Sequence, residues 1–273
     1  MATRLARAWG PGLKWIGEKG PGMTDWKLKK RALHFEIPYP RPVTTAAQAV
    51  RFIDHVGFCA LFPVKTVALP SLYYAAAKQP GAHWDSYAQL IWKWKDQLPE
   101  KRQAFYGKYF KGRGTFISLK HLPYFLAMND AAVPPGDAEE FYAAGRVSRE
   151  ALELWQSLAR LGPMPTLELR HACKMETQAG NKRFKKAILE LQKLLIVTHA
   201  GAEQETESWA SNRFDLVARR FPRQFARAAT ISCDQARRVL AQKYVGLYPG
   251  AAAAHIARLF TWSKPQALAA LSM

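Results

Sequence analysis

Asp54 and His55 are neighbouring side chains that could serve as an acid and a base. They lie in a segment that we expect to be helical. Adjacent side chains on a helix point about 100° apart and do not face each other. A surface or capping pair is therefore the simpler interpretation of these two residues.

A second group of residues is suited to contacts with phosphate. Residues 180–201 read GNKRFKKAILELQKLLIVTHAG and begin with a polar and cationic run, namely Asn181, Lys182, Arg183, Lys185 and Lys186. Phe184, Ala187, Ile188, Leu191 and Leu195 then recur at helical spacing and predict one buried face. Lys182, Lys186 and Lys193 fall on the opposite, solvent-facing side. The same pattern also describes an amphipathic helix whose lysines bind nothing.

A third group lies in KYFKGRGTF, where Lys108, Lys111 and Arg113 alternate with aromatic residues and two glycines. Glycine lets a backbone approach phosphate closely, and aromatic rings can stack on an unpaired base. A solvated turn of a hairpin is the alternative for this segment.

Several functional classes find no support in the motifs. The chain contains neither GxxxxGK[ST] nor GxGxxG, so no nucleotide-binding loop is predicted. Its three cysteines are far apart and form no CxxC pair, which indicates reduced cysteines and no zinc site. No apolar run has the length of a membrane span. We therefore expect no metal, no cofactor and no membrane partner, and a cytoplasmic protein, associated with the bacterial nucleoid when it is bound to DNA.

The charge indicates the kind of partner. The 273 residues carry 40 lysines and arginines against 21 acidic residues, a formal net charge of +19. Such an excess favours a polyanion, with nucleic acid before an anionic membrane surface. With 49% hydrophobic residues, the chain has enough apolar side chains for a sizeable core.

Residues 1–22 differ from the rest, with four cations against one acid and many glycines and prolines. They lack the apolar region of a secretory signal, so we expect a basic arm. The alternative is that the natural chain starts at Met23. Prolines at 38, 40 and 42 predict an extended lead-in up to residue 43.

Periodicity, caps and breakers predict a mostly α protein with small β-hairpins. The expected helices cover 44–57, 66–79, 85–97, 99–107, a segment from about 120, 148–161, a short helix from 166, 181–194, 232–244, 251–260 and a last one from Ser263. The expected strands cover 114–118, 195–199 and 212–218, with an acidic loop at 200–211.

The order helix, helix, basic helix, hairpin is that of a winged helix-turn-helix, in which the last helix enters the major groove. We therefore expect tandem winged helix-turn-helix units. The chain would then divide into a basic arm and lead-in (1–43), an N-terminal winged-helix-like unit (44–136), a central winged-helix unit (137–224) and a C-terminal helix-turn-helix unit (225–273). The acidic residues Glu203, Glu205 and Glu207 argue against a wing that touches phosphates.

Four stretches resemble the bacterial crosslink-repair DNA glycosylases of the YcaQ/AlkZ type. They are VRFIDHVGF, GRGTFISLKHLPYF, KKAILELQKLLIVTH with RFDLVARRFP, and ARLFTWSKPQALAAL. The resemblance covers residues 44–271 and implies tandem winged helices that bind double-stranded DNA, including alkylated or crosslinked DNA.

The resemblance also implies a Gln and, two residues later, a carboxylate that position water against the sugar of the damaged nucleotide. Here Asp54 matches the second position and Phe52 stands in the first. A phenyl ring cannot orient water by hydrogen bonds. A single carboxylate can still stabilise an oxocarbenium-like sugar. The family's large C-terminal region is not found before Met273.

Three functions therefore stay open. The first is a DNA-binding relative of these glycosylases with reduced or lost activity. The second is an active, monofunctional glycosylase that uses Asp54 on alkylated bases. The third is a winged-helix transcription regulator, which should be a dimer with two recognition helices about one DNA turn apart.

Overall fold

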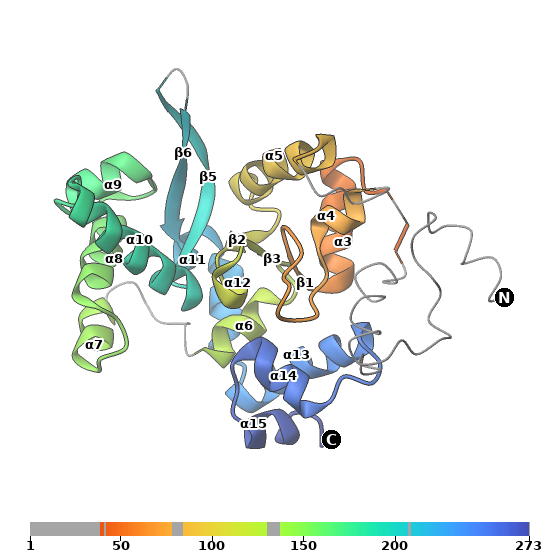
Figure 1. The fold of residues 1–273 in the computed structure, drawn as a ribbon. Helices are drawn as coiled ribbons and strands as arrows, with labels where there is room; N and C mark the ends of the chain where they lie inside the picture. The colour runs from red at the N-terminus through yellow and green to blue at the C-terminus, as the bar shows by residue number, and fades with distance from the viewer. Residues whose placement is uncertain (1–38, 41, 78–83, 130–136, 207–208, 273) are drawn as a thin grey trace.

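The computed structural model describes residues 39–40, 42–77, 84–129, 137–206 and 209–272. The expected basic arm (1–22) lies outside these ranges. In the described part the protein is mostly helical, as the sequence predicts, and it contains two small three-stranded antiparallel sheets where small hairpins are expected (Figure 1).

The first group of elements follows the order helix, strand, helix, helix, strand, strand. Its members are α3 (Ala46–Val56), β1 (Phe58–Ala60), α4 (Leu72–Ala76), α5 (Ser86–Glu100), β2 (Phe105–Gly107), the 3-10 turn η2 (Phe110–Gly112) and β3 (Thr115–Ile117). The strands pair in the order β1-β3-β2.

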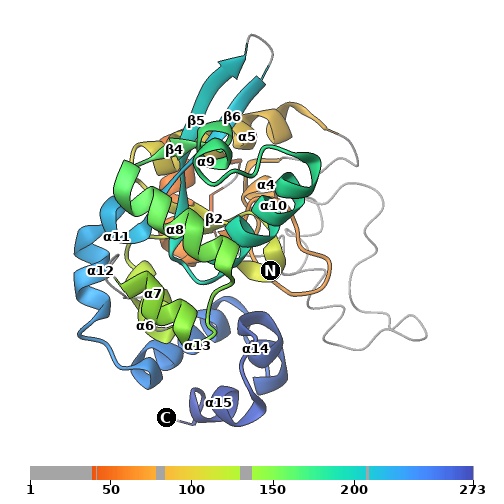
Figure 2. The same cartoon turned by 90° about the vertical axis from the view of Figure 1, so that its left-hand side faces the viewer.

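The second group repeats this order after α6 (Leu122–Met128) and α7 (Ala138–Ala143). Its members are α8 (Arg149–Leu161), β4 (Met164–Pro165), α9 (Thr166–Ala172), α10 (Gln178–Lys193), β5 (Val197–Thr206) and β6 (Trp209–Leu216). The strands pair in the order β4-β6-β5, which is the same arrangement as in the first sheet. The long β5–β6 hairpin projects from the body of the molecule (Figures 1 and 2).

Helices alone complete the described chain. They are α11 (Val217–Arg220), α12 (Pro222–Ala228), α13 (Cys233–Leu247), α14 (Ala253–Phe260) and α15 (Lys264–Ala269). Of these, α13, α14 and α15 lie below both sheets in Figure 1.

Several predicted helix boundaries are confirmed by their caps. Thr45 caps α3 with a capping box, and Gly57 ends that helix at φ 82°. Ser263 caps α15 in the same way, with Gln266 as its partner. The helix expected over 148–161 is α8, capped by Ser148.

Three predicted elements are wrong in part. The helix expected over 99–107 does not exist, because α5 continues through Pro99 and residues 105–107 form β2. The helix expected over 66–79 shrinks to α4, since Val67, Ala68 and Leu69 are buried in the core outside any helix. The expected acidic loop at 200–211 is mostly strand, and Glu203 pairs with Ser211 across the hairpin.

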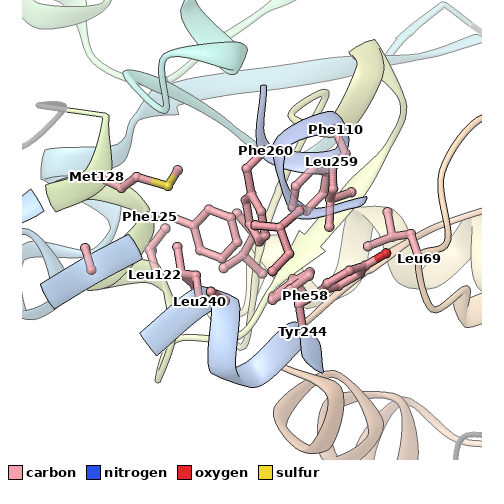
Figure 3. Close-up of a cluster of buried hydrophobic side chains, with 14 of the residues drawn as sticks. Phe58, Leu69, Phe110, Leu122, Phe125, Met128, Leu240, Tyr244, Leu259 and Phe260 are labelled. Carbon is pink, nitrogen blue, oxygen red and sulfur yellow. The ribbon is translucent and has the colours of Figure 1, made fainter. Parts of the chain in front are cut away.

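One apolar cluster joins the first sheet to the C-terminal helices (Figure 3). Phe58 of β1 and Phe110 of η2 each lie 5.7 Å, between ring centroids, from Phe260 of α14. The Tyr244 hydroxyl of α13 donates to the Ala68 carbonyl at 3.1 Å. The helices after α12 are thereby fixed against the first sheet by burial of aromatic surface.

A buried polar cluster joins the two groups of elements. His199 of β5 lies 2.6 Å, Nε2 to Oδ1, from Asp96 of α5, and the Lys95 ammonium contacts the same carboxylate oxygen. Lys95 and His199 are only 6% and 3% exposed. Nearby, the Thr198 hydroxyl of β5 donates to the Tyr106 carbonyl of β2 at 3.0 Å. The base of the projecting hairpin thus packs against α5.

The ionisation of this cluster follows from its partners. Burial opposes charge on Asp96, but hydrogen bonds from His199 and Lys95 outweigh it, so the pKa of Asp96 is lowered. Burial lowers the pKa of His199 from its ordinary 6.5, although the hydrogen bond to Asp96 acts against this. The arrangement is therefore a neutral imidazole and a charged Lys95 sharing one carboxylate.

We predict that Asp96→Asn destabilises the fold by about 1–3 kcal/mol, because it leaves the buried Lys95 ammonium without its counter-charge. Urea unfolding at pH 7 measures this. The control is Asp234→Asn, which removes an exposed carboxylate from its pair with the half-buried Arg237, and it should cost less than about 1 kcal/mol. Equal losses in the two variants would contradict the role of the cluster.

The pH dependence has a defined sign. Because the pKa of His199 is lower in the folded chain than its ordinary 6.5, the unfolded chain takes up this proton first as pH falls. The lowered pKa of Asp96 acts in the same direction at more acid pH. The free energy of unfolding should therefore fall below pH about 6.5. His199→Gln should flatten this decline between pH 6.5 and 5, and an unchanged profile would contradict the assignment.

Candidate DNA-binding and catalytic surface

Helix α10 begins three residues before the predicted start, at Gln178, with Thr177 as its cap. Gly180 is required there, because a Cβ at this position would lie 2.7 Å from the Met175 backbone. The predicted apolar face is confirmed, since Phe184, Ala187, Ile188, Leu191 and Leu195 are all buried. Because this apolar face packs against the core, the opposite, cationic face of α10 points toward solvent.

Lys182, Lys186 and Lys193 of α10 are exposed as predicted. Arg183 and Lys185 are exposed too, while Asn181 is half-buried. The Arg183 guanidinium lies 3.9 Å from a Glu150 carboxylate oxygen of α8. Among the described residues no ion pair forms with Lys182, Lys185 or Lys186. Their charge is therefore available to an external anion.

The loop with Lys108, Lys111 and Arg113 is anchored to the far end of the same helix. The backbone N–H of Lys108 donates to the Gln192 side chain at 3.0 Å, and Gln192 is buried. The two predicted cationic groups therefore lie at opposite ends of α10. They do not form one compact patch, because residues 186 and 193 are about 10 Å apart along a helix axis.

Asp54 is exposed on α3, whereas Phe52 is 3% exposed and part of the core. The Phe52 ring packs edge-on against Tyr39, with centroids 5.2 Å apart. Residues two apart on a helix point to nearly opposite sides. Any side chain at position 52 would thus be directed into the core, so Asp54 has no partner at this spacing.

Two lysines accompany Asp54 that sequence reasoning missed. The Lys243 ammonium of α13 donates to the carbonyl of His55 at 2.6 Å. Partial burial raises the pKa of Asp54, and the charge of Lys120 acts against this rise. Burial and then Lys120 lower the pKa of Lys243. These lysines stand 66 and 189 positions after Asp54, so no local pattern connects them with it.

His121 lies against Gly57, the residue that ends α3. It is 7% exposed, its Nδ1 lies 2.8 Å from the Ser118 hydroxyl, and a Cβ on Gly57 would meet its ring at 3.1 Å. Burial, then Lys243 and Lys120, lower its pKa to about 4. His121 is therefore neutral at pH 7 and contributes shape rather than charge.

The chemistry open to this surface is electrostatic. A carboxylate with lysines in its neighbourhood can stabilise positive charge on a sugar while the lysines contact phosphates. His55 is exposed beside Asp54, but adjacent helical side chains diverge. No acid/base pair is therefore assigned to them.

We also searched the described residues for a metal site, a pocket and a membrane span. No group of three or more His, Cys, Asp or Glu side chains there could hold a metal ion. A surface depression between α7, α8 and α9, lined by Glu153, Arg160 and Cys173 among others, contains none of the residues discussed above. None of the helices in the described ranges is long and apolar enough to cross a membrane.

Comparison with known proteins agrees with the resemblance noted in the sequence. A family model described as "AlkZ related" matches residues 43–261. Neither the curated proteins nor the solved structures contain a match. The matched region begins just before α3 and ends just after α14, so it includes both sheets, α10 and Asp54. The chain therefore belongs to the AlkZ-related family.

Proposed function

We propose that this protein binds double-stranded DNA through winged-helix units and is a glycosylase-like member of its family. The observation that carries the proposal is the cationic face of α10. Lys182, Lys185 and Lys186 are exposed there without ion pairs among the described residues. Membership of the AlkZ-related family supports DNA as the polyanion.

The winged-helix assignment is supported by topology. Each group of elements has the order helix, strand, helix, helix, strand, strand, and each sheet places its last strand in the middle. In such a unit the third helix reads the major groove and the hairpin forms the wing. We assign these roles to α10 and to β5–β6 in the central unit (137–224), and to α5 and β2–β3 in the N-terminal unit (44–136).

The two third helices are not equally free. Helix α5 packs against β5 through Asp96 and His199, whereas α10 keeps its cations in solvent. We therefore propose α10 as the main DNA-contacting helix. The C-terminal unit (225–273) supports the N-terminal unit through their shared core.

We predict that Lys182→Ala with Lys186→Ala weakens binding of a duplex about 10-fold or more at low salt. It should also reduce the slope of log affinity against log salt by about 2, since each neutralised phosphate contributes about 0.9. Fluorescence anisotropy across a salt series measures both quantities. Arg149→Ala with Arg160→Ala, which removes two exposed cations from α8, is the matched control and should leave the slope unchanged. A wild-type slope in the α10 variant would refute the assignment.

A second candidate function is base removal that depends on Asp54. The observation in its favour is the exposed Asp54 carboxylate, which feels the charge of Lys120, with Lys243 bound to the carbonyl of the next residue. In a glycosylase of this kind the carboxylate would stabilise the cationic sugar as the base departs. The buried Phe52 gives no help in positioning water, so any activity should be slow.

We predict that base release from a duplex with N7-alkylated guanine, if catalysed, is lost in Asp54→Asn while duplex affinity stays within about 2-fold of wild type. Gel analysis after cleavage of abasic sites measures release. Asp234→Asn is the control for loss of an exposed carboxylate elsewhere. Equal release by wild type and Asp54→Asn would exclude the catalytic role, and tight binding without any release would favour a DNA-binding relative that lacks the chemistry.

A further inference from the structure

Three cations from three parts of the chain converge beside η2. Lys111 belongs to η2, Lys193 ends α10, and Arg258 lies in the last turn of α14. The Lys111 ammonium lies 3.4 Å from the Thr261 hydroxyl, one turn beyond Arg258. A Cβ built on Gly112 would lie 4.0 Å from Cε of Lys193. We call Lys111, Lys193 and Arg258 the junction cations.

The junction cations repel one another and lack a counter-charge. Among the described residues, none of them forms an ion pair with a carboxylate. Burial, then Arg258 and Lys193, lower the pKa of Lys111. Like charges held together in this way are stabilised by any anion that enters between them.

The backbone at this point is also strained. Lys111 has φ 52° and Thr261 has φ 62°, so both partners of the hydrogen bond are left-handed. This conformation is unusual for residues other than glycine and is an outlier for a β-branched threonine. Such strain concentrates at binding sites. The partial negative charge at helix C-termini accounts for Lys193 and Arg258. It does not account for Lys111, whose backbone is left-handed.

The junction also continues the cationic face of α10. Lys182, Lys186 and Lys193 share one side of the helix, and the first and last are about 16 Å apart along its axis. This span is that of a short stretch of DNA backbone. A contact at the junction would fix where the backbone leaves α10.

We propose that the junction cations clamp one phosphate of the DNA backbone, so that the duplex is held where the N-terminal, central and C-terminal units meet. This inference rests on the proposed DNA-binding function. Arg258 can donate two hydrogen bonds to the phosphate, while Lys111 and Lys193 supply charge from either side.

The test replaces Lys111 with asparagine, which tolerates left-handed backbone and removes one charge. Lys174→Asn is the matched control, because Lys174 is also exposed at φ 51° but lines the depression between α7, α8 and α9. We expect Lys111→Asn to weaken duplex binding about 5- to 10-fold and to reduce the salt slope by about 1, with wild-type values for Lys174→Asn.

A second readout uses inorganic phosphate without DNA. Millimolar phosphate at constant ionic strength should raise the Tm of the wild type and of Lys174→Asn, and raise it less or not at all in Lys111→Asn and Arg258→Ala. Lys111→Asn itself should unfold at a Tm no lower than wild type, because repulsion is relieved.

The outcomes separate the two proposals. Failure of the wild type to bind duplex at any salt would remove the proposed function and the clamp with it. Salt-sensitive binding by the wild type with equal slopes in Lys111→Asn and Lys174→Asn would remove the clamp alone.

Discussion

The arrangement of the two sheets depends on one half-buried carboxylate. Asp96 of α5 accepts from His199 of β5 and neutralises Lys95, and two of these three side chains are almost fully buried. Buried charges are tolerated only when they are paired, so this geometry fixes how the hairpin of the central unit lies on the N-terminal unit. The same contact determines which of the two groups has a third helix with an uncovered face. Helix α5 is covered at this contact, and α10 retains an exposed cationic face.

The C-terminal helices have a comparable influence on Asp54. Their aromatic residues enter the core of the first sheet, as Figure 3 shows for Phe260 and Tyr244. Because α13 is held in this way, Lys243 reaches the carbonyl of His55. The position of Lys243 at the end of α3 is therefore a product of packing between distant segments. Catalysis at this carboxylate would require that packing to be intact.

Local patterns in the sequence predicted the features that interactions between nearby residues determine. The caps Thr45 and Ser263 and the apolar face of α10 follow from hydrogen bonds and spacing within a few residues. Strand β2 was missed because three residues carry too little periodicity, and they become strand only by pairing with β3. The acidic hairpin was missed because residues 203–208 are all polar and give no alternation of hydrophobic and polar residues.

The candidate site was predictable to the same extent. The cations of α10 and of residues 108–113 stand out as clusters in the sequence, and the structure exposes Lys182, Lys185, Lys186, Lys108, Lys111 and Arg113. Lys120, Lys243 and Arg258 are single cations in unremarkable segments, and only the fold gives them neighbours. The burial of Phe52 and the exposure of Asp54 likewise depend on which side of α3 packs against the core.

The central claim is that the DNA-binding surface runs along α10 and continues to η2. Hydrogen–deuterium exchange with and without a saturating duplex tests it most directly, at a salt concentration that preserves binding. The account predicts slower exchange in the first turns of α10 and in residues 108–113, with no change in α7 and α8. Protection confined to α7, α8 and α9, or absent from α10 while the duplex is bound, would contradict it.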